Sequence, residues 1–374
     1  MNTSSDLIAL QQWSKKQALP HAEQLVQQYY ANVPLEDLQE RELDDWGGAL
    51  LSHWRMAAKR SKNQRLIRIY NPNLSEHGWQ CPHTVIEIVQ DDMPFLVDSV
   101  GIALGGMKCG VCSVIHPVLK MARQDDGTLI GLDDNGNAES WMHFEINRIS
   151  DEQALEKIAH EITLALDSIA AIVEDWPAMT DRITTALEQL RASPPPLPAA
   201  TVKETISFLE WLLAGHFVFL GLRDYQFNEQ ELQIIPHSGK GLLRDAGLPS
   251  VSHIWASLSD DLRAIAYAPE RLLMLTKSDR RSMVHRPVYL DTILLRQLDA
   301  AGQLAGEIRI VGLYSASAYT MPPRQIPLLR QKIDGALKLC GDAELSGYRG
   351  KSLLHVLDTY PRDELIEIEV PELA

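Results

Sequence analysis

The hydrophobic period of the chain changes at Asp91-Asp92-Met93-Pro94-Phe95-Leu96-Val97-Asp98-Ser99-Val100. Residues 84–89, just before this stretch, are rich in β-branched side chains and are typical of a strand. After it, apolar side chains recur at helical spacing, at Leu96, Val100, Ala103, Leu104 and Met107. Because acidic residues often cap helices and proline is tolerated in a first turn, we expect Asp92 to cap this helix. The stretch is therefore a predicted strand-to-helix turn.

Further strands and helices are predicted on both sides of this turn. A strand is expected at 66–70 before it, and two more are expected at 111–121 and 140–149 after it. A long amphipathic helix follows, opened by a capping box of Ser150 and Gln153. The order strand, strand, helix, strand, strand, helix predicts a small two-layer α+β sandwich.

A proline-rich run at 193–198 predicts a stiff extended linker after this sandwich. Beyond it we expect a helix (201–214), two strands (216–226 and 231–235), a helical and irregular stretch (239–266), and three strands (272–276, 287–298 and 304–314). This order is that of PAS-type sensor domains, a fold analogy that specifies no ligand. Helices are then predicted at 324–339 and 350–358, and a strand at 365–370. A chain that stops where an element begins would be a fragment of a longer protein.

The predicted domain organisation is α+β with helical segments at both ends. It consists of a helical amino-terminal segment (1–62), the sandwich (63–190), a linker (191–200), a PAS-like antiparallel-sheet domain (201–318), a helical connector (319–360) and the start of a further domain (361–374).

Composition restricts the classes of partner. Of the 374 residues 50 are acidic and 35 are basic, giving a formal net charge of −15, which disfavours binding to nucleic acid or to an anionic membrane. No apolar run reaches the roughly 20 residues needed to span a bilayer, and no signal peptide is evident. Four cysteines indicate a reduced compartment, so we expect a cytoplasmic protein.

The sequence contains no recognisable catalytic or cofactor-binding motif. Gly239 and Gly241 are followed by Arg244 where a dinucleotide-binding turn needs its third glycine, and phosphate-loop, H-E-x-x-H and G-x-S-x-G motifs are absent. The run Gly105-Gly106-Met107-Lys108 is interpreted as a helix end with a glycine cap. We therefore predict no catalytic residue and no bound cofactor in this chain.

Metal binding is not expected either. Cys109, Cys112 and His116 are spaced along a predicted strand, and Cys112 and His116 would lie about 13 Å apart, too far to share an ion. The acidic connection at 125–137 is interpreted as a solvated turn.

The strand-to-helix turn is the candidate ligand site, because backbone N–H groups at such a turn can hold a carboxylate. The candidate residues are Asp91, Asp92, Met93, Pro94, Phe95 and Ser99. The alternative is that Asp92 already uses these donors as a cap.

The turn also resembles a hallmark sequence of the large bacterial NAD-specific glutamate dehydrogenases, and the similarity continues in one order along almost the whole chain. The other matching segments are Tyr29-Tyr30, Glu36-Asp37-Leu38, residues 49–55, Val114-Ile115-His116-Pro117-Val118, Val173-Glu174-Asp175-Trp176-Pro177, residues 216–223, His285-Arg286-Pro287, Arg324-Gln325-Ile326-Pro327-Leu328-Leu329 and Thr359-Tyr360-Pro361-Arg362-Asp363-Glu364-Leu365.

This resemblance implies that the sandwich is an ACT-like domain followed by a PAS-type domain, with a second ACT-like domain starting at 361–374. It implies a parent enzyme that converts L-glutamate to 2-oxoglutarate and ammonium with NAD, and a catalytic domain downstream in the same chain. It also implies a homo-oligomer and a possible amino-acid effector. The chain departs from ligand-binding ACT modules at Phe95, where they place glycine, and in taking its fourth strand from 66–70.

Two functions remain open at this point. The chain is either a regulatory and assembly segment of a glutamate dehydrogenase, itself non-catalytic, or a stand-alone small-molecule sensor of ACT and PAS type.

Overall fold

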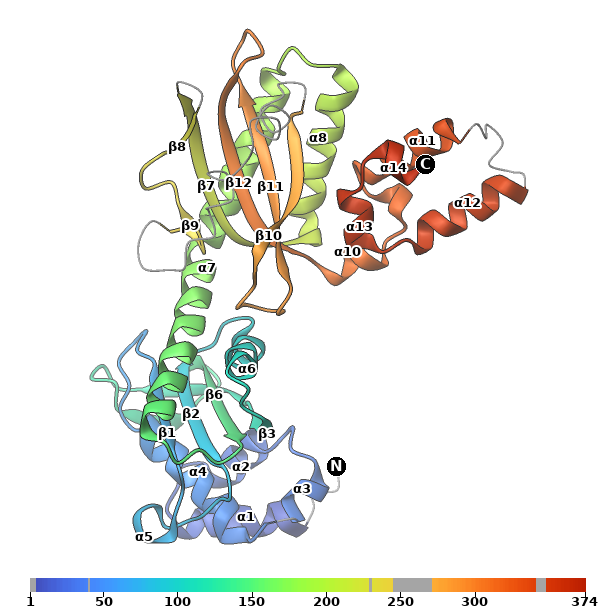
Figure 1. The fold of residues 1–374 in the computed structure, drawn as a ribbon. Helices are drawn as coiled ribbons and strands as arrows, with labels where there is room; N and C mark the ends of the chain where they lie inside the picture. The colour runs from blue at the N-terminus through green and yellow to red at the C-terminus, as the bar shows by residue number, and fades with distance from the viewer. Residues whose placement is uncertain (1–4, 40, 229–230, 245–270, 341–347) are drawn as a thin grey trace. The chain divides into compact units, whose positions relative to one another are not determined.

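The computed structural model describes residues 5–39, 41–228, 231–244, 271–340 and 348–374 (Figure 1). These residues form two compact units, one of residues 1–169 with 283–286, and one of residues 170–282 with 287–374. The units divide inside the helix α7 (Glu152–Ala192), whereas the sequence placed the boundary at the linker 191–200. The finer domain boundaries stay predictions.

The first unit contains an antiparallel sheet with helices before and after it. Its strands are β1 (Leu66–Tyr70), β2 (Thr84–Asp91), β3 (Val111–Ile115), β4 (Val118–Arg123), β5 (Leu129–Leu132) and β6 (Asn137–Ile146). The order is β1-β2-β6-β4-β5, and β3 also pairs with β6. The α+β sandwich is thus confirmed, with its fourth strand at 66–70. The strand predicted at 111–121 is two strands, because His116 and Pro117 interrupt the ladder and proline lacks an N–H donor.

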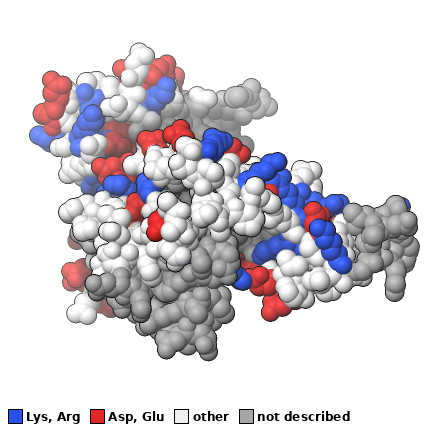
Figure 2. Space-filling model, turned by 90° about the horizontal axis from the view of Figure 1, so that it is seen from above, with Lys and Arg blue, Asp and Glu red and all other residues white. Residues whose placement is uncertain are grey.

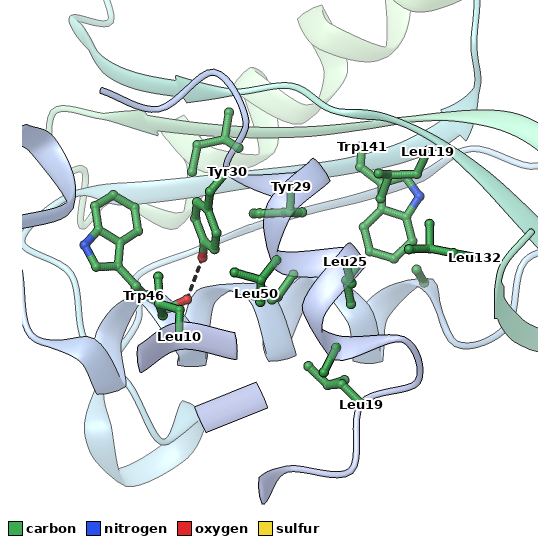
Figure 3. Packing of buried hydrophobic residues seen from close by; sticks show 14 of the residues in the cluster. Leu10, Leu19, Leu25, Tyr29, Tyr30, Trp46, Leu50, Leu119, Leu132 and Trp141 are labelled. Atoms are coloured by element: carbon green, nitrogen blue, oxygen red, sulfur yellow. Dashed lines mark hydrogen bonds between the residues drawn. The ribbon is translucent and has the colours of Figure 1, made fainter. Parts of the chain in front are cut away.

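Four helices precede this sheet: α1 (Ser5–Lys16), α2 (Ala22–Tyr29), α3 (Leu35–Gln39) and α4 (Leu43–Ala57), with the short α5 (Leu74–His77) between β1 and β2. Their buried side chains pack with Trp141 and Leu119 of the sheet (Figure 3). The Tyr30 hydroxyl also donates to the Trp46 carbonyl at 2.7 Å. The amino-terminal helices therefore form one core with one face of the sheet.

Strand register decides which residues meet those helices. In β6, Trp141 is buried in the helix-facing core, so Glu139, His143 and Glu145 lie on the same side of the strand. Met142, Phe144 and Ile146 occupy the opposite side and are also buried. The helices α6 (Leu96–Gly106) and α7 bury apolar side chains of their own, including Val100, Leu104, Ile158, Ile162 and Leu166.

The second unit contains another antiparallel sheet. Its strands are β7 (Phe217–Asn228), β8 (Glu231–Ile234), β9 (Lys240–Gly241), β10 (Leu273–Arg281), β11 (Tyr289–Leu298) and β12 (Leu304–Tyr314). Their order is β10-β11-β12-β7-β8, with β9 on β7. The helix α8 (Ala199–Trp211) precedes β7, as predicted, and the described part of the predicted stretch 239–266 ends at residue 244.

Helices end the chain: α10 (Ala316–Thr320), α11 (Leu329–Leu339), α12 (Tyr348–Thr359), α13 (Arg362–Glu367) and α14 (Val370–Leu373), with a 3-10 turn at Pro323–Gln325. The strand predicted at 365–370 is therefore wrong. Pro361 begins a helix whose first turn carries Asp363 and Glu364, and the Leu365 N–H donates to the Pro361 carbonyl at 2.9 Å. Acidic residues favour a helix amino-terminus, and this outweighed the alternating pattern that indicated a strand.

Candidate functional site

The predicted turn joins β2 to α6, but Asp92 does not cap the helix. The residue at the cap is Phe95, with a left-handed backbone (φ 70, ψ 8) and no side-chain hydrogen bond. Asp92 lies too early, because its N–H donates to the Ala138 carbonyl at 3.1 Å. The predicted cap is therefore wrong, since Met93 and Pro94 separate Asp92 from the first turn.

The candidate residues of the turn do not converge on one point. Asp91 accepts a hydrogen bond from Arg60 Nη2 at 2.7 Å, and the Asp92 side chain is exposed. The Ser99 hydroxyl donates to the Phe95 carbonyl at 2.7 Å. Met93 is half-buried and Pro94 is exposed. Binding of a carboxylate ligand at this turn stays a prediction. The negative charges of Asp91 and Asp92 would repel such a ligand.

Residues 283–286, which belong to the same compact unit, pack against this turn. The His285 N–H donates to the Ser99 hydroxyl oxygen at 3.3 Å, and the rings of His285 and Phe95 have centroids 4.7 Å apart. Burial and neighbouring Arg286 lower the pKa of the His285 imidazole, against the influence of Asp98. The Ser99 side of the turn is thus covered by protein.

The helix end predicted at Gly105-Gly106-Met107-Lys108 is confirmed, because α6 ends at Gly106. The left-handed residue is Lys108 (φ 61), whose N–H donates to the Gly105 carbonyl at 3.0 Å. The expected glycine cap is therefore wrong in detail. Gly105 and Gly106 belong to the helix itself.

The four cysteines are free thiols, and Cys112 is exposed. Within the described ranges, no group of three His, Cys, Asp or Glu side chains is arranged to hold a metal ion. No helix in those ranges has both the length and the apolar character of a membrane span.

The sequence interpretation missed a row of buried charges on the helix-facing side of the first sheet. Glu87, Glu139 and Glu145 are fully buried, and each accepts hydrogen bonds from arginine. Their partners are Arg68 for Glu87, Arg60 and Arg123 for Glu139, and Arg41 for Glu145. The sequence could have indicated this row. Glu139, Trp141, His143 and Glu145 alternate with Ser140, Met142 and Phe144, so both glutamates become buried if the helical segment 4–60 covers the Trp141 side of the strand.

Glu139 and Glu145 are held in the ionised form. Burial alone would raise the pKa of Glu139, but hydrogen bonds from Arg123 and Arg60 outweigh it and lower that pKa. The pKa of Glu145 is held well below its usual range in the same way, by Arg41 and His143. Carboxylates buried and saturated with guanidinium donors are poor proton acceptors, so this row is structural.

Two buried histidines lie beside that row. The rings of His53 and His143 have centroids 6.4 Å apart, and His53 Nδ1 shares a hydrogen bond with the Tyr29 hydroxyl at 2.8 Å. Burial lowers the pKa of His53 well below its ordinary value, helped by His143. His53 is therefore neutral in the folded protein near neutral pH.

The second unit holds a small cavity of about 330 Å³. Its lining includes Leu190, Leu272, Leu295, Arg296, Gln297 and Ile308. Nearby on the sheet, Arg309 donates to Glu307 at 3.0 Å and its guanidinium lies 4.3 Å from the Tyr225 ring centroid. On the face shown in Figure 2, the described residues present both basic and acidic side chains.

Two family profiles match the chain. The family described as "Glutamate dehydrogenase, ACT1 domain" matches residues 25–162, and "Glutamate dehydrogenase, helical motif 1" matches residues 326–374. The first match runs from within α2 through the first sheet into the start of α7, and the second includes α11 to α14.

Curated relatives match almost the whole chain. It is 35% identical to an NAD-specific glutamate dehydrogenase of Halomonas elongata over 92% of this chain and 22% of the relative. It is 32% identical to one of Pseudomonas aeruginosa, over 98% and 23%, and 22% identical to one of Mycobacterium tuberculosis, over 86% and 19%. The chain thus spans about a fifth of the length of these relatives. A solved structure described as an RNA-binding light-oxygen-voltage receptor matches at 12% identity, over 81% of this chain and 88% of that one, but its TM-score of 0.17 is too low to bear on fold or function.

Proposed function

The chain belongs to the amino-terminal region of the NAD-specific glutamate dehydrogenase family, and we propose on this premise that it is the regulatory and assembly segment of such an enzyme. The parent reaction would convert L-glutamate and NAD to 2-oxoglutarate, ammonium and NADH. The catalytic domain, with its NAD site, would lie elsewhere in the same polypeptide, in the cytoplasm.

One observation carries this proposal. Relatives at 35% and 32% identity align with nearly all of this chain, although it covers only 22% and 23% of their length. The matched region contains an ACT1 domain and a helical motif, and ACT modules commonly regulate the enzymes that carry them. A stand-alone sensor is disfavoured because the similarity to these long enzymes extends through both units.

The chemistry of the described residues supports a non-catalytic segment. Its most buried carboxylates, Glu87, Glu139 and Glu145, form ion pairs with arginines and are closed to solvent. The sequence has no glycine turn to receive a dinucleotide pyrophosphate at a helix amino-terminus. Binding and positioning are the roles left to this segment, with an amino acid as the proposed effector.

Deletion of the corresponding region from the Halomonas elongata enzyme tests the proposal. The truncated enzyme should still form NADH from glutamate, while its oligomeric state or its response to amino acids changes. A truncated enzyme that stays folded by circular dichroism and loses all NADH formation would show that this region supplies catalytic groups.

A thermal-unfolding screen of the chain tests effector binding. An amino acid at about a hundred times its dissociation constant would stabilise the chain by about 2.7 kcal/mol, a visible shift in Tm. Loss of that shift in Ser99→Ala would place the effector at the turn. A shift that survives in Ser99→Ala would place it elsewhere, with the second sheet as the next candidate.

A further inference from the structure

Strand β3 forms an open edge of the first sheet. It pairs with β6 through Val111, Ser113, Val114 and Ile115, and β6 is its one strand partner among the described residues (Figure 1). The backbone N–H and C=O groups on its other side are thus available to a further strand. Such an edge favours pairing with another chain unless it is blocked.

Three valines along this edge are exposed on one face of the sheet. Val111, Val114 and Val118 oppose Ile146, Phe144 and Ser140 of β6, which alternate along that strand and so share a face. Their exposed fractions are 42%, 41% and 47%. One exposed valine is ordinary, but three along a single edge form an apolar patch, and such patches mark interfaces.

The edge carries no charge in a strongly acidic chain. Residues 109–118 contain no Asp, Glu, Lys or Arg, although the net charge is −15. Two copies that approached through an acidic surface would repel each other, whereas these ten residues can meet their own copy without like charges in opposition. The lysines that natural edge strands use to prevent pairing are missing here.

The helix α6, which precedes this edge, carries three glycines whose Cα atoms are not covered by other elements. Apart from chain neighbours and the backbone of α6 itself, a methyl group added at Gly101, Gly105 or Gly106 would meet no described atom within 4 Å, so packing against other elements does not require these glycines. Glycine inside a helix is less favourable than alanine. Gly101 and Gly105 lie one turn apart on one side of α6, and Gly106 lies five residues before β3. A second backbone could approach this side closely.

We propose that β3 pairs antiparallel with β3 of a second copy of this chain, about a two-fold axis. Such an interface is self-complementary, since each copy offers the same open backbone edge and the same valines. The Val111, Val114 and Val118 side chains of both copies would then leave water together. The two sheets would join into one continuous sheet across the dimer.

This inference rests on the assembly part of the proposed function and identifies the surface that performs it. The two can fail separately. A chain that does not dimerise would refute the β3 interface and leave the proposed function untouched. NADH formation by the isolated chain would refute the non-catalytic role and leave the interface untouched.

Sedimentation velocity of the 374-residue chain tests the interface. We expect a dimer, and Val114→Lys should weaken it by about tenfold or more, because it places a charged side chain in an apolar interface. Val356→Lys is the matched control, since Val356 is 56% exposed on α12 and its variant should dimerise normally. Equal Tm values for the variants would establish that Val114→Lys is folded.

A cross-linking experiment locates the contact. In a Cys109→Ser, Cys340→Ser background, Cys112 is the exposed thiol, since Cys81 is buried. In antiparallel pairing centred at Cys112 or Ser113, two Cys112 side chains lie about 5 to 8 Å apart, so a short bis-maleimide should link the copies. A chain that is monomeric at high concentration, or a dimer that keeps its affinity in Val114→Lys and gives no Cys112 cross-link, would overturn the proposal.

Discussion

Arg123 donates two hydrogen bonds to Glu139, from Nε at 2.6 Å and from Nη2 at 2.9 Å. Arg60, which follows α4, donates to the same carboxylate at 2.8 Å. Glu139 therefore connects the strands β4 and β6 to the end of the amino-terminal helices. This arrangement makes the helical segment and the sheet a single folding unit.

Glu139→Gln should reduce the free energy of unfolding by about 3–5 kcal/mol, because it removes the carboxylate that pairs with the largely buried Arg123 and leaves Arg60 with Asp91 alone. The matched control is Glu23→Gln, which removes a carboxylate that is 64% exposed and paired with Lys15. That change should cost at most about 0.5 kcal/mol. Urea unfolding followed by circular dichroism measures both, and equal losses would show that the buried ion pairs do not stabilise the fold.

The same pairs predict how stability depends on pH. The pKa values of Glu139 and Glu145 are lower in the folded protein than their ordinary value of 4.5. As the pH falls, the two carboxylates therefore bind protons in the unfolded chain before they do so in the folded protein. Their contribution to the free energy of unfolding is complete above pH 4.5 and is lost as the pH falls through their lowered pKa values in the folded protein. Unfolding free energies measured from about pH 7 to pH 3 should fall steeply at the acid end. Glu139→Gln should show a shallower fall, and an unchanged slope would contradict the assignment.

Phe95 gives a test of backbone strain at the turn. Its φ of 70 is unfavourable for any residue with a side chain, and the ring is only half-buried. Phe95→Gly should therefore be more stable than Phe95→Ala by about 1 kcal/mol, the reverse of the usual order in helices. If the alanine variant proves as stable as the glycine variant in urea unfolding, the left-handed cap is not present in solution.

Much of this fold follows from local patterns. The strand at 66–70, the two-layer sandwich and the long helix α7 follow from hydrophobic periodicity. The predicted capping box of Ser150 and Gln153 is wrong, because the Gln153 N–H donates to the Asp151 carboxylate at 3.2 Å. The cap at Phe95 was missed because no propensity favours phenylalanine with a positive φ. The buried row at Glu87, Glu139 and Glu145 was missed because its arginine partners lie far away in the sequence, and only the register of β2 and β6 brings them together.

The proline-rich connection gives a prediction about proteolysis. Residues 193–198 lie between α7 and α8 and belong to no helix or strand. Limited proteolysis should cut there before it cuts inside α7 or β11, whose backbone groups are protected by hydrogen bonds. Mass spectrometry of the first fragments identifies the site, and early cleavage inside α7 would mean that this helix is not continuous.

We propose that this chain regulates and assembles an enzyme whose chemistry is performed elsewhere. The most direct measurement is glutamate-dependent NADH formation by the purified chain, followed by absorbance, with the Halomonas elongata enzyme assayed alongside as the active control. We predict no NADH formation by the chain, and no heat of NAD binding in calorimetry, because no glycine turn receives the pyrophosphate. NADH formation at a rate proportional to the concentration of this chain would show instead that the chain itself carries a catalytic site.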